Sequence, residues 1–175
     1  MAFNSYAAPK VPTDRFKLYI DIGEGNSDGY EFELQGRGIT NWTIDRNNNT
    51  SKQVDVLRYV DIQRGVPQPT QNVTVYIRSG SKFAEIIAEA DFTGDETKLN
   101  AMNILHKFEY LDGKDEDSCK AKLNKNVFVE VVSFNGEADN YLNYTLNFHY
   151  SNDFVLGTMP KKDGDTITFT PDSAA

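Results

Sequence analysis

The feature that most constrains the fold is an alternation of apolar and polar residues that recurs along the chain. It is strictest in residues 16–22, where every second residue is apolar, and it resumes from Tyr30 to Gln35 after the glycine-rich stretch 23–29. A period of two places the apolar side chains of a strand on one face. These two runs therefore predict a pair of half-buried strands joined as a β-hairpin.

The same alternation returns in several later segments. One of them, 127–132, has apolar residues at both parities, which predicts a strand buried on both faces. In total we expect six to eight strands and a mainly β or α+β fold, with antiparallel sheets packed as a sandwich or barrel and one or two flanking helices. The further predicted strands are 39–45, 54–62, 72–78 and 142–148.

Two stretches have the apolar spacing of a helix. Between Ala101 and Phe108 apolar residues fall at i, i+3, i+4 and i+7, and a Thr-x-x-Glu capping box beginning at Thr93 could start such a helix. Residues 82–90 have the same spacing, although their paired isoleucines also permit a strand. The sequence predicts a helix ending near Phe108 and leaves 82–90 open between helix and strand.

The 175 residues show no shift in composition, and we expect one domain covering 1–175. Prolines and small polar residues in 1–15 and 151–175 predict an extended arm at each end, the second with one short strand at most. The Asn-rich segment 46–71 predicts a long exposed loop with strand-like arms.

Charge and apolar runs restrict the partners and the compartment. A net charge of −8 with no basic stripe argues against sequence-specific DNA binding. No apolar run approaches the roughly 20 residues that span a bilayer, and the first residues lack a signal peptide's apolar stretch. The single cysteine, Cys119, lies in the charged segment 112–125; we expect it on an exposed loop, without a disulfide, as in a reducing cytoplasm.

No constellation of residues predicts catalysis or a bound cofactor. The glycines of 23–29 do not match G-x-G-x-x-G, and the acids of 112–117 lack calcium-loop spacing. His106 and His149, the two histidines, are far apart and have no metal-ligand motif around them. We therefore expect no catalytic residue, no cofactor and no metal.

The order of these features resembles the major tail tube proteins of long-tailed, siphovirus-like bacteriophages. The paired first strands, the long central loop and the helix after the middle strand all follow that order. The closest likeness is the late strand pair VFVEVVSFNGEADNYLNYTLNFHYS, followed by Gly157 and Thr158, and the stretch DFTGD (91–95) adds to it. The resemblance covers most of the chain.

The resemblance implies a structural protein of the phage virion, made in the cytoplasm of the host bacterium. Its partners would be copies of itself in stacked hexameric rings, other phage tail proteins, and DNA that passes through the lumen without sequence-specific binding. Edge strands, arms and loops could supply the contacts between copies. Arg46, Arg58 and Arg64 in the long loop are candidates for pairing with acidic residues of an adjacent ring.

Two other functions fit the same composition. A monomeric ligand- or carbohydrate-binding β-sandwich could use Tyr19, Tyr59 and Tyr141 as an aromatic platform. An unrecognised hydrolase would need a cleft with a perturbed carboxylate or histidine, which spacing alone does not reveal.

Overall fold

The computed structural model describes residues 10–23, 29–35, 39–48, 50–54, 60–136, 141–162 and 167–172. For residues 39–42, 51–54 and 60–64 the description is limited to the backbone. Phe3 and Tyr6 of the predicted N-terminal arm lie outside these ranges.

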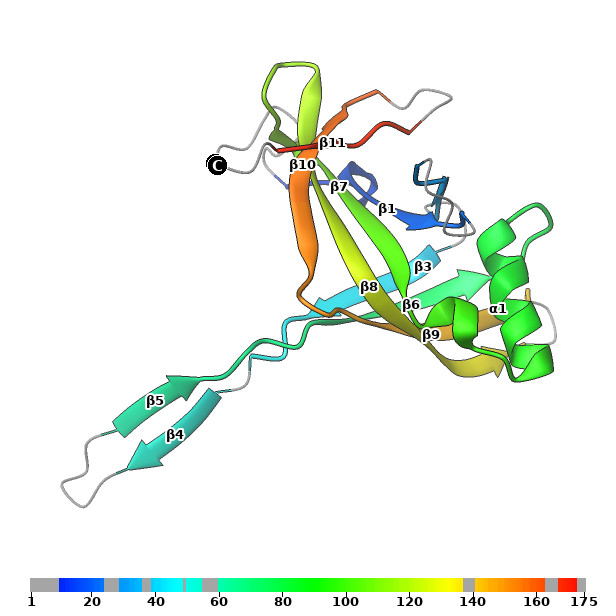
Figure 1. The fold of residues 1–175 in the computed structure, drawn as a ribbon, viewed down its shortest axis with the longest axis horizontal. Coiled ribbons are helices and arrows are strands. Elements are labelled where there is room, and N and C mark those ends of the chain that lie inside the picture. The colour runs from blue at the N-terminus through cyan, green and yellow to red at the C-terminus, as the bar shows by residue number, and fades with distance from the viewer. Residues whose placement is uncertain are drawn as a thin grey trace.

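Antiparallel strands make up most of the molecule (Figure 1). Nine strands form one continuous sheet with the order β2-β1-β7-β8-β9-β6-β3, to which β10 adds beside β8, and β11 beside β10. The mainly β or α+β prediction is confirmed. The strands are β1 (Phe16–Asp21), β2 (Phe32–Leu34), β3 (Ile39–Asp45), β6 (Thr70–Tyr76), β7 (Met102–Asp112), β8 (Ser118–Asn135), β9 (Asn143–His149), β10 (Phe154–Pro160) and β11 (Thr170–Pro171).

Strand β8 is long enough, at 18 residues, to belong to two differently directed parts of this sheet. Its first half, up to Asn124, pairs with β7 and β10, and its second half, 128–135, pairs with β9. Between the halves the register with β7 shifts, and Asn126 adopts a positive φ of 52°, as at a β-bulge. We call β2, β1, β7, the first half of β8, β10 and β11 the first sheet, and the second half of β8, β9, β6 and β3 the second sheet.

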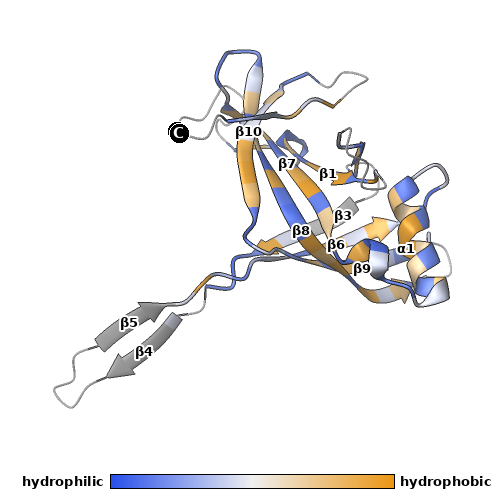
Figure 2. Cartoon of the chain, in the orientation of Figure 1, coloured by the Kyte–Doolittle hydropathy of each residue, from blue (hydrophilic) through white to orange (hydrophobic). Residues whose placement is uncertain are grey.

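The main core lies between the two sheets and beneath helix α1 (Lys82–Thr93). Phe83 and Ile87 of α1 are fully buried there, and Figure 2 shows apolar and polar residues on different faces of this helix. The Ser81 hydroxyl accepts a hydrogen bond from the Ala84 amide (3.3 Å) and caps the helix, which ends at Gly94 with φ 71°. Residues 82–90, left open by the sequence, are therefore helical.

A second apolar cluster covers the opposite face of the first sheet. Tyr19, Leu105 and Met159 are among its buried members, and Ile167 and Phe169 from the C-terminal segment pack against it. Phe169 can come this close because position 157 is glycine: a Cβ there would lie 2.3 Å from the Thr170 carbonyl oxygen. The central strands of the first sheet are consequently buried on both faces.

The helix predicted to end near Phe108 is wrong, because this stretch forms strand β7. Ile104 faces the main core while its neighbour Leu105 faces the second cluster, and both are fully buried. A strand buried on both faces loses the alternation of period two, and its consecutive apolar residues imitate the spacing of a helix. The capping box is absent as well, because α1 ends at Thr93 and Asp95 instead accepts a hydrogen bond from the Thr97 amide.

The exposed position predicted for Cys119 is also wrong. Cys119 is fully buried in β8, and its thiol donates a hydrogen bond to the Met159 carbonyl oxygen (3.5 Å). In this part of β8 lysines alternate with small or apolar residues, so the charged composition of 112–125 concealed a strand. The length of the lysine side chains lets one face of the strand carry charge while the other is buried.

The segment 151–175, predicted as an arm, contains strand β10, which pairs with β8 from Phe154 to Pro160. Thr158 and Met159 are buried, so the beginning of this segment belongs to the first sheet. The strand has only short apolar runs interrupted by Gly157 and bounded by Pro160, which is why its sequence reads as irregular.

Between β3 and β6, strands β4 (Thr50–Val54) and β5 (Val60–Arg64) project from the body as a separate hairpin (Figure 1). These two strands pair only with each other among the described strands. The strand-like arms expected in 46–71 are therefore present. Within the described residues, no helix is long and apolar enough to cross a membrane.

Candidate assembly surfaces

The second sheet turns a polar face away from the core. Along β6 and β9 the residues between buried positions are mainly Asn and Thr, and the register places Asn72 opposite Asn147 and Asn147 opposite Glu130 of β8. The Asn72 amide donates to Asn147 (2.9 Å), the Asn147 amide donates to Glu130 (3.2 Å), and the His149 imidazole lies 2.9 Å from the same Glu130 oxygen. Hydrogen bonds from His149 and Asn147 lower the pKa of Glu130.

This network continues to the end of the sheet. The Asn135 amide lies within hydrogen-bond distance of Ser133 (2.9 Å), Thr145 (3.2 Å) and Asn143 (3.4 Å). Neither β6, β9 nor the second half of β8 contains a lysine or arginine. The polar face thus offers amide and hydroxyl groups bound mainly to each other, with no lysine or arginine from these strands.

The second sheet ends in two open edges. Among the described residues, β3 pairs only with β6, and the second half of β8 pairs only with β9. Val132 and Phe134 are half exposed at the β8 edge. Unpaired edge strands present backbone donors and acceptors to another chain. Because the sheet has an even number of antiparallel strands, its two edges run in opposite directions, and β3 of one copy can pair antiparallel with β8 of another.

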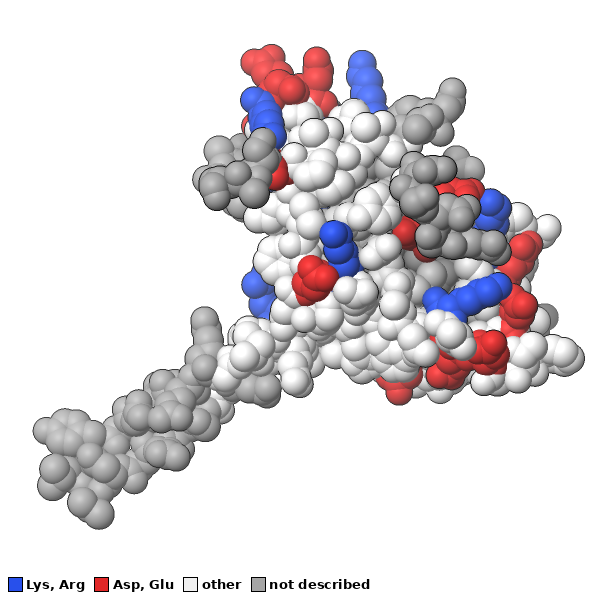
Figure 3. All heavy atoms as spheres, in the orientation of Figure 1, with Lys and Arg blue, Asp and Glu red and all other residues white. Residues whose placement is uncertain are grey.

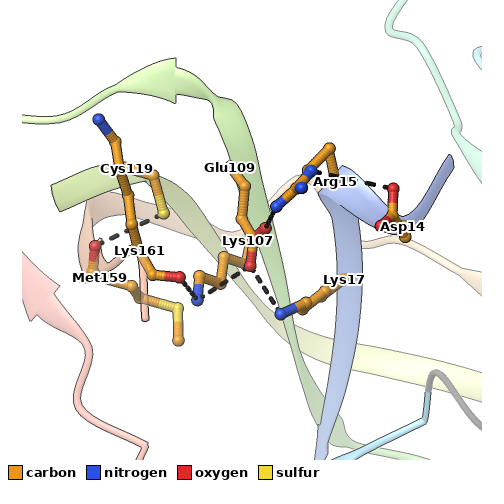
Figure 4. A network of polar contacts seen from close by, with 8 residues as sticks. All are labelled: Asp14, Arg15, Lys17, Lys107, Glu109, Cys119, Met159 and Lys161. Atoms are coloured by element: carbon orange, nitrogen blue, oxygen red, sulfur yellow. Dashed lines mark hydrogen bonds and ion pairs between the residues drawn. The ribbon is translucent and has the colours of Figure 1, made fainter. Parts of the chain in front are cut away.

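A buried charge network joins residues 15–17 and Lys161 to strand β7 of the first sheet (Figure 4). The Glu109 carboxylate, 3% exposed, contacts the ammonium groups of Lys17 (2.7 Å) and Lys107 (3.3 Å) and the guanidinium of Arg15 (3.3 Å). Lys107 also donates to the Lys161 carbonyl oxygen (3.1 Å). Burial alone would raise the pKa of Glu109, but the hydrogen bonds and charges of Lys17 and Lys107 outweigh it and lower that pKa.

The three arginines singled out in the sequence are not brought to one described site. Arg46 is exposed directly after β3. Arg64 is the last residue of β5, where the description is limited to the backbone, and Arg58 lies outside the described residues. Their pairing with another ring stays a prediction.

Three further kinds of candidate site were a catalytic histidine, a metal site and the aromatic platform. His106 is buried, its Nε2 lies 3.1 Å from the Tyr150 hydroxyl, and burial together with the charge of Lys122 lowers its pKa to about 3. In the part of the chain that the structure describes, no three His, Cys, Asp or Glu side chains gather as metal ligands. Tyr19 cannot belong to an aromatic platform at the surface, because it is only 1% exposed. Tyr141 is exposed, and Tyr59 lies outside the described residues.

No protein-family model and no curated protein matches the chain. Several solved structures do match the chain. The tail of an empty gene transfer agent particle, solved with C6 symmetry, superposes with a TM-score of 0.55 at 9% identity, covering 82% of this chain and 96% of the other. The SPP1 tail tube gives 0.55 at 10% identity, covering 79% and 74%.

The chain has the fold of a tail tube protein. A sheath–tube complex of an extracellular contractile injection system also superposes, with a TM-score of 0.50 at 9% identity, covering 91% of this chain and 99% of the other. The resemblance drawn from the order of the sequence features is thereby confirmed for the fold.

Sequence reasoning missed the polar face. The signal was present, because Asn or Thr occupies every second position in 70–74 and in 143–147. Asn72 and Asn143 also belong to Asn-x-Thr sequons, which carry no information about a sheet face. Only the register shows that these residues lie side by side across three strands.

Replacing Glu109 by Gln should destabilise the fold by about 3–5 kcal/mol at pH 7, because Lys107 would remain buried without its carboxylate. Since the folded-state pKa of Glu109 is lowered from 4.5, its contribution is complete above that pH and disappears as the pH falls further. The difference in unfolding free energy between wild type and Glu109→Gln, measured in denaturant titrations, should therefore be smaller at pH 3 than at pH 6. Glu116→Gln, at an exposed carboxylate, is the control; equal unfolding free energies for Glu109→Gln and wild type at pH 7 would contradict the assignment.

Proposed function

We propose that this chain is the structural, non-enzymatic subunit of a phage tail tube, built as one domain over 1–175. Copies would form hexameric rings that stack into a tube within the virion and conduct DNA during ejection. The observation that carries the proposal is the second sheet, with two open edges of opposite direction in a chain that has the fold of tail tube proteins. One of these similar structures has C6 symmetry.

Ring closure follows from pairing the β3 edge of each subunit with the β8 edge of the next. This contact uses two different surfaces of the chain, so it repeats around a ring instead of ending in a dimer. Six copies of the four-stranded second sheet would give a barrel of about 24 strands, which at ~4.8 Å spacing and ~40° tilt has a backbone diameter of roughly 50 Å. Barrels of about 16–18 strands already enclose water-filled channels, so this one would have room for double-helical DNA.

In such a ring the polar face would line the lumen, because the other face of the second sheet is buried in the main core. Phosphates bind chiefly to lysine and arginine, and each such contact slows a moving strand of DNA. A wall of mutually hydrogen-bonded Asn, Thr and Ser side chains, with Glu130 as its acidic member, offers DNA few sites to hold. Such a lumen would neither bind DNA strongly nor repel it strongly.

The projecting hairpin would reach the neighbouring ring. Residues 46–64 have a net charge of +2, whereas the whole chain has a net charge of −8. The hairpin's basic residues are Arg46, Lys52, Arg58 and Arg64, and its acidic residues are Asp55 and Asp61. Opposite charge between this hairpin and the rest of the surface favours contact with another copy. Other phage tail proteins would meet the ends of the tube.

Assembly should protect the amides of β3 and of residues 128–135 from hydrogen exchange, because each gains a backbone partner in the ring. The measurement compares hydrogen exchange by mass spectrometry in dilute monomer and in tubes identified by negative-stain microscopy. Strand β7, paired on both sides in one subunit, serves as the internal control. Particles that stay monomeric at every salt and protein concentration would contradict the proposed function, as would saturable glycan binding by such a monomer.

Asn72→Lys should convert the lumen into a DNA-retaining surface, because every ring would gain six positive charges on the polar face. Assembled variant tubes should retain DNA in a pull-down assay at low salt and release it as salt rises. Asn100→Lys adds the same charge at an exposed position outside that face and should behave as wild type. Equal retention by the two variants would contradict the lumen assignment.

Arg58→Glu together with Arg64→Glu should hinder stacking while leaving single rings intact, since the hairpin lies apart from the second sheet. The expected result is a shift from tubes to short rings in negative-stain images, with unchanged thermal unfolding. Normal tubes from this double variant would show that these arginines play no part in stacking.

A further inference from the structure

The projecting hairpin of β4 and β5 has one apolar and one polar face. The register pairs Val54 with Val60 and Lys52 with Ile62, which places these four residues on the same face. We call Val54, Val60 and Ile62 the apolar face of the hairpin. The pairs on the other face are all polar, namely Ser51 with Gln63 and Gln53 with Asp61.

This hairpin stands away from the core of its own subunit. Strands β4 and β5 pair only with each other among the described strands, and Figure 1 shows their backbone clear of the body. A two-stranded hairpin alone is at best marginally stable in water, and it gains stability when its apolar face packs on another surface. The apolar face of the hairpin therefore fits a surface that another subunit supplies.

One end of the second sheet presents exposed apolar side chains. Phe134 of β8 is 53% exposed, and Tyr141 and Leu142, just before β9, are 75% and 50% exposed. The Ile77 amide donates a hydrogen bond to the Leu142 carbonyl oxygen (2.9 Å), and the Tyr141 ring packs edge-on against Tyr76, with 6.2 Å between the ring centroids. These contacts hold the exposed residues at the shared end of β6, β8 and β9. We call Phe134, Tyr141 and Leu142 the apolar rim.

The strand register places the hairpin and the apolar rim at opposite ends of the second sheet. Asp45, after which the chain continues into the hairpin, lies in one row with Thr70 and His149. Phe134 pairs with Tyr144, near the other end of β9. Within one subunit the hairpin therefore points away from the rim, and Figure 1 shows it leaving the body on the side opposite helix α1.

Stacking of rings brings these two surfaces together. The strands of the proposed barrel incline by ~40° to its axis, so one end of every second sheet faces the ring above and the other end faces the ring below. The hairpin leaves from the first of these ends, and its five-residue strands add about 17 Å of reach. Because hairpin and rim are different surfaces, their contact repeats from ring to ring along a tube.

The charges at the two ends also favour this contact. Residues 46–64 have a net charge of +2. Helix α1 lies beside the rim, because Asp91 accepts a hydrogen bond from Tyr144 (3.1 Å), whose ring lies 5.0 Å from that of Phe134. Residues 82–98, which contain α1, have five acidic and two basic residues, a net charge of −3, and Figure 3 shows acidic residues gathered over this end of the molecule. Opposite charge steers the hairpin of one ring toward this end of the next.

We propose that the apolar face of the hairpin packs on the apolar rim of a subunit in the neighbouring ring. This inference rests on the proposed function and names the surface that receives the hairpin. The apolar side chains of both surfaces leave water in the contact, and this burial stabilises the stack. Salt screens exposed charges but not apolar burial, so the stacked rings should persist at salt concentrations that weaken ion pairs.

Matched substitutions test both sides of this contact. Ile62→Asp and Leu142→Asp should each raise the protein concentration needed for tubes at least about tenfold while single rings still form, because each variant buries a carboxylate in the stacking contact. Gln63→Asp, next to Ile62 but on the polar face of the hairpin, and Leu156→Asp, at a leucine of β10 with a similar exposure of 54%, should form tubes at the wild-type concentration. Sedimentation with negative-stain microscopy measures the amounts of rings and tubes.

A photo-cross-linking experiment identifies the receiving surface directly. Benzoylphenylalanine at position 62 should cross-link in tubes to Phe134, Tyr141 or Leu142 of another subunit, whereas the same group at position 63 should not. Dilute monomer should give no such product, because hairpin and rim lie at opposite ends of one subunit. This measurement decides the contact even if Leu142→Asp lowers the thermal stability of the subunit.

The outcomes separate this contact from the proposed function. Wild-type tubes together with normal tubes from Ile62→Asp and Leu142→Asp would overturn the contact and leave the tube subunit standing. Cross-links from position 62 that map only to other parts of the neighbouring subunit would have the same meaning. Failure of the wild type to form tubes at any salt or protein concentration would overturn the proposed function, and this contact with it.

Discussion

The whole structure depends on strand β8 belonging to both sheets. Its first half holds β7 and β10 on either side, and the C-terminal segment packs against the face that carries Cys119, Ala121 and Leu123. The bulge at Asn126 then redirects the strand, so that its second half holds β9 and leaves one edge open. One strand therefore joins the first sheet to the second.

The buried groups and the surfaces open to another copy lie in different places. The Glu109 network and the second apolar cluster belong to the first sheet, and the main core lies between the two sheets and beneath α1. The two open edges of the second sheet and the projecting hairpin lie outside this core. Groups exposed in this way are what repeated contacts between identical copies require.

The sequence predicted the fold well where a strand has one buried face, and poorly where it has two. Residues 142–148 alternate cleanly, with one buried face. In β1, predicted as half-buried, Leu18 and Tyr19 are buried on opposite faces, and in β7 the adjacent apolar residues Ile104 and Leu105 lie on opposite faces and imitated a helix. The candidate surfaces were mostly beyond prediction, since Asn72, Asn147 and Glu130 become neighbours only through strand register.

The burial of Cys119 has a consequence for a particle that leaves its host. The proposed role takes the protein from a reducing cytoplasm into an oxidising medium, where accessible thiols cross-link or become sulfenic acids. The chain has a single cysteine, and its side chain is fully enclosed between β8, β10 and the C-terminal segment. Oxidation follows accessibility, so a tube of these subunits can persist outside the cell without sulfur chemistry altering its walls.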